Sequence, residues 1–258
     1  MIPQSVNSLK STKMKSLLII LHIVLLSAMS AKAQFITSGK IEYERKINIH
    51  AQMEEMEDNE WIQKIKSQMP KFTSAYFDMV FDTGRVSYKP GRESPNPIKM
   101  FGNGPATENI VYTDLTGKHV KSMKTVYEQK FLVQDTLRTL KWKEKDEIRM
   151  IAGYKCHKAV SIICDSVYVV AFYAEDLPVT GGPEMFCGLP GMILELAVPR
   201  LHTTWVATKV EQKTLADADF VIPEKGKKVT QDAMQETIKE SFKSWGKSAT
   251  RNMWWTVL

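Results

Sequence analysis

Short runs of alternating apolar and polar residues, separated by turns, dominate the chain after residue 108. Such runs are typical of half-buried strands, and links this short leave little room for the helices that parallel crossovers need. We therefore predict a mainly β fold with a single antiparallel curved sheet, a meander of half-barrel-like form, in which the last four runs are neighbours in order. The expected strands are 109–114, 119–126, 128–134, 137–143, 154–163, 167–174, 192–198 and 203–212.

The remaining segments add a strand, a hairpin and two amphipathic helices. Residues 41–49 alternate as a strand, and residues 77–88 form a hairpin that turns at Thr83-Gly84. Apolar residues recur at helical spacing over 51–69, which ends before Pro70, and again over the C-terminal helix 231–245. Between the hairpin and the next strand, residues 89–109 are rich in proline and glycine and are expected to form a long loop.

Residues 1–33 have the layout of a secretory signal peptide. Three lysines precede an apolar run over 17–28, and Ala31-Lys32-Ala33 fits the small-x-small pattern that signal peptidase cleaves. The apolar run is too short for a permanent membrane span. We therefore predict cleavage after Ala33, no retained transmembrane segment, and an exported protein of the periplasm or outer membrane whose single domain spans 34–258.

Removing that segment also removes four lysines. The remaining chain has 31 basic and 29 acidic residues, a net charge of +2, with the two signs interspersed. A near-neutral, mixed surface gives no electrostatic reason to bind nucleic acid or an anionic membrane. The length of this segment is sufficient for one sizeable core.

Gly188, Leu189, Pro190 and Gly191 form the most conspicuous motif of the chain. Glycine and proline at this density predict a rigid turn with a residue at positive φ, which leads into the apolar strand at Met192. The alternative is that the two glycines allow backbone amides to approach a ligand. Both interpretations remain open, although no general base or nucleophile accompanies the turn.

The segment from Gly188 to Glu195 closely resembles the signature of the GLPGLI family of exported proteins from Gram-negative bacteria, with Met192 in place of a leucine. Other segments resemble the family in the same order, and the resemblance covers nearly all of the chain after the signal peptide. It implies an exported protein of shared fold, and it implies no reaction because the family has no characterised function. These segments are Gly39–Tyr43, Phe131–Val133, Ile151–Ala159, Ala171–Pro178 and Gly182–Pro183.

The three cysteines allow one disulfide with a thiol left over. Cys156 and Cys164 lie about 26 Å apart on one extended strand, too far for a bond. A hairpin at Cys164 brings Cys156 to the end of the sheet from which the loop with Cys187 leaves, so Cys156 and Cys187 are the expected pair. The alternative is that Cys156 is a buried core thiol.

No residue pattern indicates a catalytic set, a metal site or a cofactor. Cys156 and His157 point to opposite faces of a strand, and no His or Cys pair has zinc-ligand spacing. The preferred function is a non-enzymatic binding or carrier protein with an apolar pocket in the curved sheet, whose partner is a hydrophobic ligand or an outer-membrane protein. The alternatives are a thiol-dependent enzyme or redox protein that uses Cys187 or Cys156, and a copper- or metal-binding protein that uses some of the eleven methionines after residue 33.

Overall fold

The structure is a computed structural model, and its described residues form one twelve-stranded sheet with short helices. The described residues are 35–55, 60–95, 105–126, 129–164, 166–241 and 253–258. The strands are β1 (Gly39–Asn48), β2 (Phe72–Phe81), β3 (Arg85–Pro90), β4 (Ile110–Asp114), β5 (His119–Val126), β6 (Gln129–Thr136), β7 (Lys143–Ile151), β8 (Tyr154–Ile163), β9 (Val167–Ala174), β10 (Met192–Val198), β11 (Thr203–Gln212) and β12 (Lys227–Val229).

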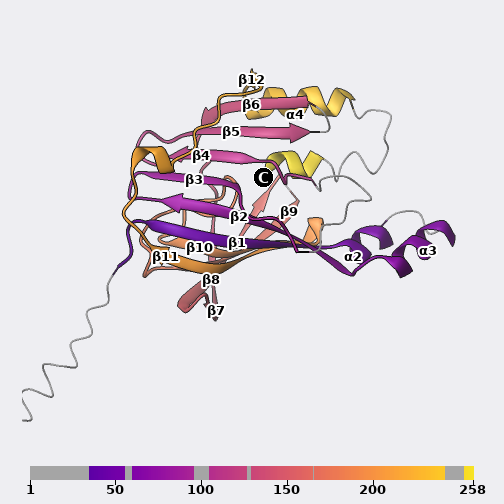
Figure 1. The fold of residues 1–258 in the computed structure, drawn as a ribbon, viewed down its shortest axis with the longest axis horizontal. Coiled ribbons are helices and arrows are strands. Elements are labelled where there is room, and N and C mark those ends of the chain that lie inside the picture. Colours follow the sequence, from indigo (N-terminus) through magenta and orange to yellow (C-terminus); the bar gives the residue numbers. More distant parts are fainter. Residues whose placement is uncertain (1–34, 56–59, 96–104, 127–128, 165, 242–252) are drawn as a thin grey trace, which may run out of the picture. The chain divides into compact units, whose positions relative to one another are not determined.

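Two antiparallel meanders make up the sheet. The strand order is β12-β6-β5-β4-β3-β2-β1-β11-β10-β9-β8-β7, so pairing of β1 with β11 joins the first meander to the second. Figure 1 shows the strands from β6 to β1 stacked in this order. The predicted fold class is confirmed, and so is the antiparallel order of β8, β9, β10 and β11. The parallel pairing of the short β12 with β6 was not predicted.

The sheet curves strongly because of one short connection. Strands β6 and β7 are ten positions apart in the strand order, which would separate them by about 48 Å in a flat sheet. Residues 137–142, which join them, reach at most about 25 Å. The two ends of the sheet must therefore bend toward each other, as the half-barrel prediction requires.

The same connection corrects one predicted strand. Residues 137–142 are not a strand, and the strand that follows is β7 at Lys143–Ile151. The end of the segment alternates like a strand because Leu140 and Trp142 both pack against the main core. By contrast, β7 is an edge strand, exposed at most positions and rich in charge, so its sequence lacks the apolar alternation that identifies a strand.

The helix predicted over 51–69 is not continuous. Helix α2 (Ile49–Glu54) ends at Glu54, and α3 (Glu60–Gln68) follows after residues 56–59, which lie outside the described residues. The amide of Ala51 donates to the side chain of Asn48, which caps α2 at a distance of 3.1 Å. Pro70 follows the second helix, as expected.

The predicted C-terminal helix is confirmed as far as it is described. Helix α4 (Gln231–Ser241) buries Met234 and Ile238, and the rest of the predicted span lies outside the described residues. Residues 253–257 form a further helical turn that was not predicted. Two 3-10 turns, η2 (Pro199–Leu201) and η3 (Asp217–Asp219), complete the described elements. None of the described helices has the length and apolar character that crossing a bilayer requires.

The main core lies on the concave face of the sheet. Alternate residues of β1, β2 and β3 are buried there, and the ring of Phe77 stacks on that of Tyr88 at 4.9 Å. The antiparallel pairing of β2 with β3 confirms the predicted hairpin, and its alternate apolar residues point into the core. Between β3 and β4 no described residue is helical or in a strand, and residues 96–104 of this predicted loop lie outside the described residues.

Candidate functional site

Three charged side chains are buried on the concave face. Arg45 of β1 and Lys124 of β5 are each 1% exposed, and Glu184 in the loop before β10 is 2% exposed. Burial of a charge is costly unless the charge is paired, so such residues are rare in a core that only stabilises a fold. They mark the part of the concave face most suited to binding.

Arg45 is held by aromatic rings and one carbonyl. It lies opposite Trp205 of β11, and its guanidinium carbon is 5.9 Å from the centre of that ring and 5.3 Å from the ring of Trp255. Its Nη1 donates to the carbonyl oxygen of Pro105 at 2.8 Å. Burial lowers the pKa of Arg45, against the opposing influence of nearby Glu184. Its Nε has no hydrogen-bond partner in the described part of the chain.

Glu184 is the buried acid of the group. Its backbone lies in the left-handed region at φ +56°, which is rare for a residue with a side chain. The amide of Asn109 donates to its Oε2 at 2.9 Å, whereas Oε1 has no partner among the described residues. Burial raises the pKa of the Glu184 carboxyl, and the hydrogen bond from Asn109 and the charges of Lys124 and Arg45 oppose this increase.

Lys124 binds main-chain oxygens near residue 258. Its Nζ donates to the carbonyl oxygen of Thr256 at 2.9 Å and also to the main-chain oxygen of Leu258. Burial lowers the pKa of Lys124 to about 7, the charge of Glu184 opposes this change, and the charge of Arg138 adds to it. The amine therefore changes its charge near neutral pH.

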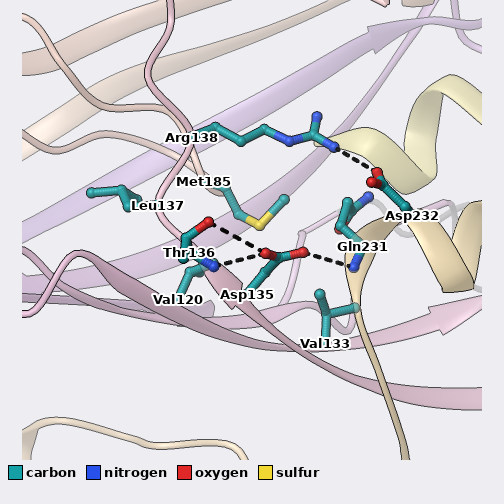
Figure 2. Close-up of a pocket in the computed structure, with 9 residues that line it drawn as sticks. All are labelled: Val120, Val133, Asp135, Thr136, Leu137, Arg138, Met185, Gln231 and Asp232. Atoms are coloured by element: carbon teal, nitrogen blue, oxygen red, sulfur yellow. Dashed lines mark hydrogen bonds and ion pairs between the residues drawn. The ribbon is translucent and has the colours of Figure 1, made fainter.

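A cavity of about 230 Å³ lies beside this group. Figure 2 shows the Asp135 carboxylate between Thr136 and Gln231, with Met185 above it. The backbone amide of Gln231 donates to Asp135 at 3.0 Å, and Arg138 forms a 3.9 Å ion pair with Asp232. Both charged and apolar groups face the space. Its lining residues are Val120, Val133, Asp135, Thr136, Leu137, Arg138, Met185, Gln231 and Asp232.

Two lining residues connect the cavity to the buried charges. The side-chain amide of Gln231 donates to the carbonyl oxygen of Thr256 at 2.8 Å, the same oxygen that Lys124 binds. Met185 directly follows Glu184 in the loop. The Oε1 atom of Gln231 is buried without a hydrogen-bond partner in the described structure.

The two glycines of the sequence motif have structural roles. Gly188 has φ +95°, and its amide already donates to the Thr180 hydroxyl at 2.7 Å. A Cβ on Gly191 would lie 2.1 Å from the carbonyl oxygen of Ala174, so only glycine fits there. These contacts support the rigid-turn interpretation. Ligand binding by the motif itself stays a prediction.

The other two motif residues differ in exposure. Leu189 is buried in the main core, whereas Pro190 is exposed. The indole of Trp142 donates to the carbonyl oxygen of Cys187 at 2.8 Å, which ties the loop to the connection before β7. The motif therefore fixes a loop whose upstream residues, Glu184 and Met185, reach the buried charges and the cavity.

No disulfide joins any of the three cysteines, all of which are described. Cys156 and Cys187 are buried, and Cys164 is exposed. Burial raises the pKa of Cys156 to about 12 and that of Cys187 to about 11, so both thiols are protonated at neutral pH. Pairing of these two cysteines on oxidation stays a prediction.

Metal-ligand residues do not gather in the described part of the chain. There, no group of three or more His, Cys, Asp and Glu side chains could hold a metal ion. His157, predicted to point away from Cys156, lies 6.1 Å from the ring of Tyr173.

The residue patterns of the sequence alone did not identify Arg45, Lys124 or Glu184 as site residues. A signal was present for Arg45, because it shares its strand parity with Ile41 and Tyr43 and must therefore face inward. Lys124 shares the parity of buried Val120 in the same way. No periodic signal exists for Glu184, because it lies in a loop.

Comparison with known proteins gives a match of one short segment to a family model and a likeness of fold. Residues 162–195 match the model of a family described as a protein of unknown function, Porph_ging. Two crystal forms of PNGF-II, in space groups P21 and C2, resemble the structure with TM-scores of 0.52 and 0.51 at 14% and 15% identity. The alignments cover 80% and 79% of this chain, which spans about a third of PNGF-II, 34% and 33%. No curated protein matches the chain in sequence.

Proposed function

We propose that this chain is an exported, non-enzymatic binding protein, and that its ligand site is the cavity lined by Met185 and Gln231. One observation carries the proposal. The cavity of about 230 Å³ combines apolar walls with the charged side chains of Asp135, Arg138 and Asp232. Small-molecule sites typically combine an apolar lining with a few polar groups that fix the orientation of the ligand.

The cavity's volume and lining residues indicate the size and polarity of the ligand. Its volume of about 230 Å³ lies below the roughly 300–1,000 Å³ of typical small-molecule sites. It suits a small molecule or one end of a larger one. Val120, Val133 and Leu137 favour an apolar body, and the carboxylates of Asp135 and Asp232 favour a hydrogen-bond donor. This extends the predicted apolar pocket to an amphipathic one.

Location and family belong to the same proposal. The family match includes the Gly188–Gly191 motif, which supports membership of the GLPGLI family. The signal-peptide pattern of residues 1–33 supports export to the periplasm or outer membrane. N-terminal sequencing of the exported protein should begin at Gln34.

The two alternative functions have less support. A reactive thiol needs a lowered pKa, whereas burial raises the pKa of both Cys156 and Cys187. Monovalent copper favours several soft ligands, and of the nine residues that line the cavity in the described structure one, Met185, is a methionine.

Binding of 1-anilinonaphthalene-8-sulfonate tests the site. The dye is apolar, has an N–H donor, and carries an anionic group that Arg138 would attract. We expect saturable fluorescence enhancement with the wild-type protein. Met185→Trp should weaken dye binding at least about ten-fold, because the larger side chain fills part of the cavity.

The matched control is Met150→Trp. Met150 is 69% exposed on β7 and does not line the cavity, so this variant should bind the dye as the wild type does. Circular dichroism establishes that both variants are folded. Equal dye binding by a folded Met185→Trp variant, or no binding by the wild type, would refute the assigned site.

A further inference from the structure

Residues 253–258 occupy the concave face of the sheet beside the buried charges. Trp255 is 5% exposed and Leu258 1%, and both belong to the main core. Figure 1 shows this segment in yellow, beside the label that marks the chain end. Residues 253–257 are helical and pair with no strand of the described sheet. The segment therefore contacts the sheet through side-chain interactions and not through the backbone hydrogen bonds of paired strands.

Polar side chains from the surrounding elements donate hydrogen bonds to the main chain of this segment. Lys124 donates to the main-chain oxygens of Thr256 and Leu258, and Gln231 donates to that of Thr256 at 2.8 Å. Both donors are themselves buried, at 1% and 3% exposure. Without an occupant, Lys124 would lose these two acceptors and Gln231 would lose one, which is costly for groups removed from water.

An aromatic anchor completes the contact. The ring of Trp255 lies 6.3 Å from that of Trp205, at 56°, and the guanidinium of Arg45 is 5.3 Å from its centre. Tilted aromatic pairs and a cation over an indole both favour tryptophan at this position. The Nε of Arg45 has no hydrogen-bond partner in the described structure.

The contacts reach across the sheet. Lys124 is on β5, Arg45 on β1, Trp205 on β11 and Gln231 on α4. Strands β5 and β11 are five positions apart in the strand order, so only a concave surface lets one six-residue segment touch both. The surface binds two main-chain oxygens and one indole, which are features that any peptide with a matching side chain could offer.

We propose that the concave face around Arg45, Lys124 and Trp205 is a binding site for an aromatic peptide segment, which residues 253–258 fill as an internal occupant. The partner is a protein segment with a tryptophan followed three residues later by leucine, as Trp255 and Leu258 are spaced. The proposal goes beyond the cavity at Met185, since this site takes a peptide, whereas the cavity takes a small amphipathic molecule.

Competition with a synthetic peptide tests the proposal in the full chain. The probe is fluorescein-labelled Met-Trp-Trp-Thr-Val-Leu with an amidated carboxyl end, read by fluorescence polarisation. The wild-type segment competes at an effective concentration of about millimolar because it is tethered. Trp255→Ala removes its anchor, so this variant should bind the probe at least about ten-fold more tightly than the wild type.

Two controls make the result specific. Trp254→Ala is the matched variant, because the ring of Trp254 is partly exposed and lies 4.7 Å from the guanidinium of Arg200, so probe binding should stay at the wild-type level. A probe with alanine in place of its second tryptophan should not bind Trp255→Ala. Leu258→Ala removes a second buried contact of the internal segment and should also increase affinity for the probe.

Folding is checked by circular dichroism, and Leu258→Ala serves as the test if Trp255→Ala does not fold. A folded Trp255→Ala or Leu258→Ala variant that binds the probe no better than the wild type would overturn the proposal. Equal gains for Trp254→Ala and Trp255→Ala would also overturn it. Dye binding at the cavity is measured on the same variants, so failure of one site is distinguishable from failure of the other.

Discussion

At the scale of residues, strand parity explains two of the three buried charges. Arg45 and Lys124 occupy inward positions of β1 and β5, so their burial follows from the same alternation that predicts the strands. Glu184 differs, because a loop with a left-handed residue has no period from which burial could be predicted. The candidate site was therefore partly visible in the sequence.

Lys124 should make stability depend on pH above neutrality. Burial lowers its pKa from 10.5 to about 7 in the folded protein. Below pH 7 both folded and unfolded states hold the proton, and the cost of burying the charge is at its greatest. Between pH 7 and 10.5 the unfolded state binds more protons, so stability rises with pH by up to about 1.4 kcal/mol per unit.

Urea denaturation of the wild type and Lys124→Met from pH 6 to 9.5 measures this effect. The free energy of unfolding of the wild type, minus that of the variant, should increase as the pH rises above 7. Both proteins contain Glu184, so most of the pH dependence that comes from the Glu184 carboxyl cancels in this difference in the free energy of unfolding. A difference independent of pH would show that Lys124 does not change its charge in this range.

The cysteines should differ sharply in reactivity. Iodoacetamide at pH 7.5 should modify exposed Cys164 and leave Cys156 and Cys187 of the native, reduced protein unmodified, because burial raises the pKa of both. All three should react once the protein is unfolded. Peptide mass mapping identifies the modified sites. Rapid modification of native Cys187 would instead favour the thiol-dependent alternative.

At the scale of elements, local patterns predicted the strands that bury one face. Hairpin β2–β3 and the pair β8–β9 follow apolar alternation and turn residues. Edge strand β7 was missed because its mostly exposed residues do not alternate. A single helix was predicted over 51–69 because the apolar residues keep helical spacing throughout. This spacing does not show that the first helix ends before Glu55.

Gly191→Ala should destabilise the fold. The new Cβ would lie 2.1 Å from the carbonyl oxygen of Ala174, and backbone on both sides must move. We expect a loss of about 2–3 kcal/mol and a fall in Tm of roughly 4–12 °C, measured by calorimetry. Gly84→Ala is the control, because its Cβ would meet two side-chain oxygens, of Thr116 at 3.2 Å and of Asp82 at 3.7 Å, and no backbone, so the change should stay within about 1 kcal/mol. Similar Tm values for the two variants would contradict the close-approach role of Gly191.

At the scale of the whole molecule, the pairing that unites the sheet could not be predicted. β1 and β11 are far apart in sequence, and no turn or spacing specifies that they are neighbours. The curvature, by contrast, follows from the short link between β6 and β7 once the strand order is known. The likeness to PNGF-II extends to the fold and to about a third of that protein.

Native mass spectrometry of the protein purified under native conditions tests the central claim of ligand binding most directly. We expect a fraction of the protein to carry a non-covalent adduct that Met185→Trp reduces, because that variant fills the cavity, and that Met150→Trp retains. The wild type without any adduct, together with no binding of the dye, would contradict a binding function at this cavity.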